Sequence, residues 1–139
     1  MSAYKQYGTD VSKEVEGVVV ELGTNEDGTV YSATVSRAGK ANKAYQTALT
    51  KATSPYQRQI ANGTLDPVLS EKIYLEVFCK TVLKGWTNMR DENDNELLFT
   101  VENAIKVMTD LPELYMELAT KANTAATFKA EDLEEGAKN

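Results

Sequence analysis

Histidine is absent from this chain of 139 residues. Histidine is the commonest general base at neutral pH and the commonest metal ligand, so its absence excludes Ser-His and Cys-His nucleophiles. The sequence also lacks a glycine-rich phosphate loop and a metal-ligand motif. We therefore expect a protein that is not an enzyme and that holds no cofactor and no metal.

Cysteine occurs once, as Cys79, so no intramolecular disulfide can form, which fits a reducing cytoplasm. Cys79 lies among apolar residues, and a reactive thiolate needs exposed, electropositive surroundings, so we expect a buried structural thiol. The polar amino terminus lacks the apolar core of a signal peptide, and no apolar run is long enough to span a membrane. These absences predict a cytoplasmic protein with no membrane partner.

Basic residues are outnumbered, with 15 Lys and Arg against 21 Asp and Glu, a net charge of −6. An electrostatic nucleic-acid binder needs a basic face, so we expect no nucleic-acid partner. Apolar residues make up 42% of the chain, enough for one domain with a proper core. We predict a flexible arm over residues 1–13, one globular domain over 14–128, and an acidic, disordered tail over 129–139.

The longest apolar segment, residues 66–85, predicts a central buried helix. Asp66 suits the N-cap, Pro67 the first helical position, and Gly85 the left-handed conformation that ends many helices. Apolar residues cover most of its circumference, which indicates burial on most sides. A narrow charged stripe marks its wet side: Lys72, Glu76, Lys80 and Lys84.

The segments around this helix predict an α+β fold. Residues 15–22 and 30–38 have the alternation of strands, and Asp27-Gly28 between them favours a hairpin turn. Helical spacing of apolar residues predicts four further helices near residues 41–52, 56–61, 101–108 and 111–122. We therefore expect an N-terminal β-hairpin followed by a compact bundle of about five helices around the central buried helix (66–85).

Two places in the sequence are candidate partner-binding sites. From Arg37 to Tyr45 the positive charges bunch where a strand passes into a helix; the segment is either a turn capped by Asn42 or a contact point for a partner. Trp86 is either a lid on the core or an interface anchor. The candidate partner-binding residues are Arg37, Lys40, Asn42, Tyr45 and Trp86.

Two acidic segments are interpreted differently. The run from Asp91 to Asn95 has acidic residues at alternate positions, as calcium loops do, but it lacks the glycine that such loops need and is too short. It is interpreted as a solvated turn. The acidic tail, Glu131 to Glu135, is interpreted as a solubilising segment, with partner contact as the alternative.

Several short motifs resemble the tail assembly chaperone family of long-tailed, siphovirus-like bacteriophages. The motifs are Arg37-Ala-Gly-Lys-Ala-Asn42 with Tyr45, Leu83-Lys-Gly85-Trp86, and Asp91 with the block LLFTVENAIKVMTDLPEL. The similarity runs from about Val30 to the end of the chain. Related sequences tend to have Asp-Gly in the loop after the tryptophan, where this chain has Asp94-Asn95; asparagine also tolerates the left-handed conformation.

The resemblance implies a non-enzymatic protein of the host cell cytoplasm. Such a protein binds the tape measure protein, keeps it soluble, promotes tail tube assembly and is absent from the mature virion. The resemblance also implies three further partners: the tail tube protein, a longer frameshifted form of the chain, and other copies of itself. The alternative is a structural tail-completion or connector subunit that is retained in the virion.

Overall fold

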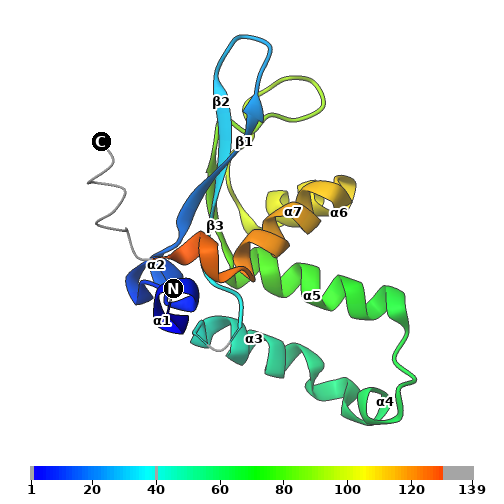
Figure 1. Ribbon diagram of the computed structural model, residues 1–139. Helices are drawn as coiled ribbons and strands as arrows, with labels where there is room; N and C mark the ends of the chain where they lie inside the picture. Colours follow the sequence, from blue (N-terminus) through cyan, green and yellow to red (C-terminus); the bar gives the residue numbers. More distant parts are fainter. Residues whose placement is uncertain (1, 40, 130–139) are drawn as a thin grey trace.

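A three-stranded antiparallel sheet with helices against one of its faces forms the part of the chain that the computed structural model describes, residues 2–39 and 41–129 (Figure 1). Strand β1 (Val18–Thr24) pairs with β2 (Val30–Val35), and β2 pairs with β3 (Leu83–Thr87). The arrangement confirms the predicted α+β class and the N-terminal hairpin.

The hairpin forms because buried and exposed side chains alternate along its strands. Val20 pairs with Ala33 and both are buried, whereas Val19 on the other face of β1 is exposed. At the turn, Asp27 accepts a hydrogen bond from the backbone N–H of Thr29, and Gly28 has a φ of 90°. Only glycine adopts such a φ without strain, so Asp27-Gly28 makes the turn that the sequence predicts.

The central helix is present, but its predicted end is wrong. Helix α5 (Pro67–Thr81) starts as expected, with the Asp66 side chain accepting a hydrogen bond from the Val68 N–H. It ends at Thr81 rather than Gly85, and residues 83–87 form β3 instead. The reason is tertiary: β2 offers an unpaired edge, and pairing of β3 with it satisfies the backbone groups of both strands. Lys84 therefore belongs to the sheet and not to the charged stripe.

The remaining elements follow the predicted order, with two additions at the start. Residues 3–16, most of which were expected to be a flexible arm, contain two short helices. The predicted tail, residues 129–139, lies outside the described residues except for Lys129. The elements are α1 (Ala3–Tyr7), α2 (Val11–Glu16), α3 (Lys43–Thr53), the 3-10 turn η1 (Ser54–Tyr56), α4 (Gln57–Asn62), α6 (Val101–Asp110), α7 (Pro112–Ala122) and the 3-10 turn η2 (Ala125–Phe128).

The core lies where the inner face of the sheet meets α5, α6 and α7. Helix α3 packs on one side of α5, and α6 with α7 on the other (Figure 1). The Phe78 ring meets the Tyr115 ring edge-on, with 5.2 Å between centroids. Met108, Leu118 and Phe128 are fully buried among them. The position of α5 between these layers confirms it as the central element.

A buried hydrogen-bond network joins the sheet to the helices. The Ser36 hydroxyl donates to the carbonyls of Thr81 and Val82, at 3.2 Å each. The Asn42 amide donates to the Ser36 hydroxyl at 3.1 Å and to the Thr81 carbonyl at 3.2 Å. The Asn42 side-chain oxygen accepts from the Tyr45 N–H at 3.0 Å and caps α3. We call Ser36, Asn42 and the Thr81 carbonyl the junction network.

Asn42→Ala should destabilise the protein far more than loss of an ordinary helix cap. The substitution removes the α3 cap and takes away one of the hydrogen bonds made by each of two buried groups, the Ser36 hydroxyl and the Thr81 carbonyl. We expect a loss of about 2–4 kcal/mol in unfolding free energy. Thr100→Ala is the matched control, because Thr100 caps α6 at an exposed position, and it should cost about 1 kcal/mol. Urea unfolding measures both; equal losses would contradict the role of the network.

Candidate functional site

Arg37, the first of the sequence-predicted binding residues, is used inside the protein. Its guanidinium lies 3.7 Å from the Glu14 carboxylate and its charged end lies over the Phe128 ring, 5.6 Å from the centroid. Its backbone N–H donates to the Glu14 carbonyl. The side chain is only 21% exposed. Arg37 thus fastens the N-terminal helix α2 and the C-terminal turn η2 to the end of β2.

The other predicted binding residues in this segment are Lys40, Asn42 and Tyr45. Asn42 is buried in the junction network, and Tyr45 is half-buried against the core. Burial raises the pKa of Tyr45. Lys40 lies outside the described residues. The described part of the segment therefore faces inward at the positions that sequence reasoning selected for a partner.

Trp86, the last predicted residue, closes one side of the core. Its indole N–H donates to the Leu97 carbonyl at 2.7 Å, and its ring meets Phe99 edge-on at 5.0 Å. It is half-buried, and its register on β3 places it opposite Ala33, on the inner face of the sheet. The structure does not bring Trp86 together with Arg37 or Asn42 into one site.

A hollow of about 610 Å³ opens instead between the outer half of α5 and the pair α6–α7. Helix α5 extends beyond the other two helices, which leaves one of its sides uncovered there (Figure 1). Val68 is 73% exposed and Met116 is 64% exposed, so the rims are apolar and accessible. We call this hollow the α5–α6–α7 groove. Its apolar lining is Val68, Leu75, Ile105, Met108, Pro112, Tyr115 and Met116.

The groove follows from local sequence. Thr100 caps α6 by accepting from the Asn103 N–H, and Ala104 and Met108 on one face of α6 are buried. Asp110 ends α6, and Pro112 starts α7 after a single residue, since proline needs no hydrogen bond at the first helical position. Both helices are thereby set against α5 by a very short connection. Sequence reasoning selected residues 37–45 and Trp86 and did not locate this groove.

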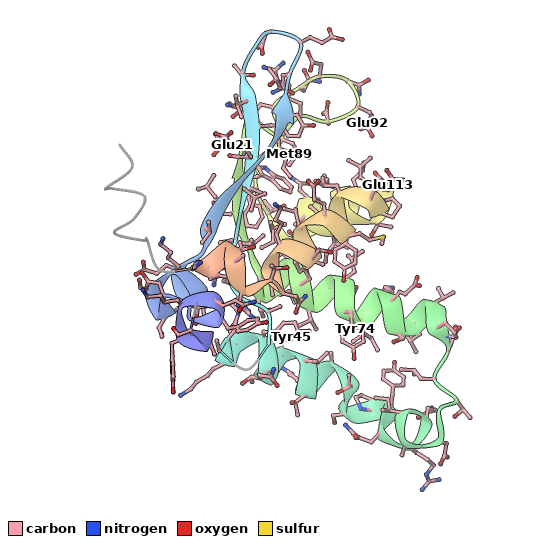
Figure 2. All side chains as sticks on the ribbon, in the orientation of Figure 1. Glu21, Tyr45, Tyr74, Met89, Glu92 and Glu113 are labelled. Atoms are coloured by element: carbon pink, nitrogen blue, oxygen red, sulfur yellow. The ribbon has the colours of Figure 1, made fainter. Side chains whose placement is uncertain are left out.

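A second hollow of about 610 Å³ lies beside the first, between α6–α7 and the loop of residues 88–96, and it is acidic. Figure 2 shows Glu92 on the loop and Glu113 beside the α6–α7 pair. Pro112 lines both hollows, so they adjoin at the start of α7. The carboxylates that line the second hollow are Asp91, Asp94, Asp110 and Glu113.

The cation in the second hollow already has partners. Arg90 lies 2.6 Å from the Asp27 carboxylate and 3.3 Å from that of Asp94. The hydrogen bond from Arg90 lowers the pKa of Asp27, and the same bond raises the pKa of Arg90. These pairs fasten the hairpin tip to the loop of residues 88–96, where Asp91 accepts from the N–H groups of Asn93 and Asn95 and closes a turn.

The groove offers shape and apolar surface rather than reactive groups. Burial raises the pKa of the Cys79 thiol to about 12 and that of the Tyr115 hydroxyl to about 12. Within residues 2–39 and 41–129, no cluster of three or more His, Cys, Asp or Glu could hold a metal ion. No helix in the same residues is long and apolar enough to cross a membrane. This arrangement can bind an apolar segment of another molecule.

Comparison with known proteins gives one family. A family model described as YdaY prophage protein matches residues 40–139, which include all of the groove. No curated protein and no solved structure matches the chain.

Alkaline pH should destabilise the folded chain through Cys79 and Tyr115. Their folded pKa values of about 12 lie above the ordinary 9.0 and 10.0, so their contribution to stability is complete below about pH 9 and is lost as pH rises toward 12. Urea unfolding from about pH 8 to about pH 11 measures the loss. Cys79→Ala should give a shallower decline than the unsubstituted chain; identical slopes would contradict the assignment to Cys79.

Proposed function

Because this chain belongs to the YdaY prophage protein family and is therefore phage-related, we propose that it is a bacteriophage tail assembly chaperone. In this role it binds the tape measure protein in the host cell cytoplasm, keeps it soluble and promotes assembly of the tail tube. It acts by binding, not by catalysis, and leaves before the virion is complete. The short motifs that resemble tail assembly chaperones of long-tailed phages support this proposal.

The observation that carries the proposal is the α5–α6–α7 groove. A groove between packed helices accepts the apolar face of an amphipathic helix, one of the recurring modes of peptide recognition. Val68 and Met116 stand exposed on its two rims and are apolar, and such patches mark interaction sites on soluble proteins. A long helical partner that aggregates through its apolar face would be kept soluble by covering that face.

Further partners follow from the same proposal. A chaperone must transfer its cargo, so the tail tube protein would compete for the tape measure protein as the tube polymerises. A longer frameshifted form of the chain would carry the same groove, and several copies would be needed to cover a long tape measure protein. None of these partners requires a nucleic acid or a membrane.

One observation favours the alternative of a tail-completion or connector subunit. The outer edge of β1 pairs with no strand among the described residues, and Val19 on that strand is 62% exposed. Open edges can add a strand from a neighbouring subunit, as subunits of a ring would need. A ring subunit stays in the particle, so the two functions differ in whether purified virions contain the chain.

Co-expression with the tape measure protein tests the chaperone function. We expect the chain to raise the soluble fraction of the tape measure protein severalfold, and Val68→Asp with Met116→Asp to abolish the effect. Both residues are exposed, so the double variant should unfold at the same temperature as the unsubstituted chain. Val19→Asp, on the open face of the sheet, is the control and should retain the effect.

Two results would contradict the proposal. One is a tape measure protein that is equally insoluble with and without the chain. The other is stoichiometric recovery of the chain in purified virions, which would favour the connector function.

A further inference from the structure

We propose that the α5–α6–α7 groove selects a basic amphipathic helix, one with lysine or arginine on both sides of its apolar stripe. This inference rests on the proposed function, because it specifies which segments of the cargo the groove would bind. It adds a charge requirement to an apolar one. The observations that carry it are the charges along the groove and in the acidic hollow beside it, and which of those charges are paired within the protein.

The first observation is the charge of the groove itself. Among the described residues that line it, Glu71 and Glu76 are acidic and Lys72 is basic. None of the three forms an ion pair with another described residue. Glu71 is exposed and Glu76 is half-buried. The α5 rim therefore carries a surplus of negative charge with no internal partner.

The second observation is that the acidic hollow extends the groove past Pro112. Two cations beside this hollow already have partners: Arg90 pairs with Asp27 and Asp94, while Lys106 lies 3.0 Å from Asp110 and 3.4 Å from Glu92.

By contrast, Glu113 forms no ion pair with a described residue and remains available at the start of α7. Carboxylates without an ion-pair partner thus lie on both sides of the combined surface, Glu71 and Glu76 on the α5 wall of the groove and Glu113 in the acidic hollow beside it.

These charges discriminate between amphipathic helices that would fit equally well by shape. A helix flanked by lysine or arginine gains attraction to both walls, and the long aliphatic stems of its side chains cover the apolar rims. A helix flanked by glutamate is repelled, which excludes it. The same repulsion disfavours a second copy of this chain as the occupant, because each copy has a net charge of −6.

Binding of three designed peptides tests the charge requirement. The peptides share one apolar stripe over about 18 residues, or about five helical turns, and differ only in having lysine, glutamine or glutamate at the flanking positions. Fluorescence anisotropy on the full chain measures their affinities. At low salt we expect the lysine peptide to bind about tenfold more tightly than the glutamate peptide, with the glutamine peptide between them. Near 1 M salt the difference should shrink to about twofold or less, because salt screens exposed charges.

A matched pair of triple variants locates the effect. Glu71→Gln, Glu76→Gln and Glu113→Gln remove two charges from the groove and one from the acidic hollow beside it. They should abolish the preference for the lysine peptide while leaving the affinity for the glutamine peptide unchanged. The control removes three charges from exposed positions on α2 and the hairpin, so it changes the net charge equally. The control substitutions are Glu16→Gln, Glu21→Gln and Glu26→Gln, and the preference should survive them.

Each outcome is decisive for this inference. Equal affinity of the lysine and glutamate peptides, binding of none of the three, or an equal loss of preference in both triple variants would overturn it. The chaperone function is tested separately, by solubility of the tape measure protein. Solubilisation that survives the groove triple variant at high and low salt, with no peptide preference, would remove the basic-helix inference and leave the proposed function in place. A clear preference for the lysine peptide, without any effect on the solubility of the tape measure protein, would contradict the proposed function and leave the charge selectivity of the groove in place.

Discussion

The junction network is the interaction on which the rest of the structure depends. Ser36 at the end of β2 and Asn42 at the start of α3 both bond to the Thr81 carbonyl at the end of α5. Three elements are thereby fixed to one another by buried hydrogen bonds, which are costly to leave unmade. The network lies where α5 ends, and β3 follows directly and joins the sheet. It also fixes the direction in which α5 leaves the sheet.

That direction produces the groove. The carboxyl-terminal half of α5 is buried against the sheet, α6 and α7, whereas Val68 near its start is largely exposed. A helix anchored at one end and uncovered at the other gives a rigid wall that needs no ordering when a partner binds, and rigid elements hold binding sites better than loops do. The carboxyl-terminal half of α5 therefore stabilises the fold, and its amino-terminal half provides the proposed binding surface.

The sequence predicts local features well because their causes are local. The Asp27-Gly28 turn, the start of α5 at Asp66, and the Thr100 cap each depend on residues within a few positions of one another. The end of α5 is predicted wrongly because residues 83–87 take their pairing partner from β2, about fifty positions earlier. Helical spacing cannot reveal a partner at that distance.

The candidate site is predicted less well for the same reason. Arg37 was selected for its charge, but Glu14 and Phe128, which lie far away along the chain, hold it inside the protein. Trp86 was selected for its type, and its partner is the Leu97 carbonyl. The groove combines side chains from three helices, each of which alone reads as an ordinary amphipathic segment. No pattern in one segment could locate the groove. The only signal in the sequence was that apolar residues cover most of the circumference of α5, more than the other elements of the fold bury.

Hydrogen–deuterium exchange on the chain with and without the tape measure protein tests the central claim most directly, namely that the groove is the binding site. Binding should slow exchange at the backbone amides of residues 68–76 and 105–116, and leave residues 37–45 and Trp86 unchanged. Protection confined to residues 37–45 and Trp86, with no change along α5, α6 and α7, would contradict the account.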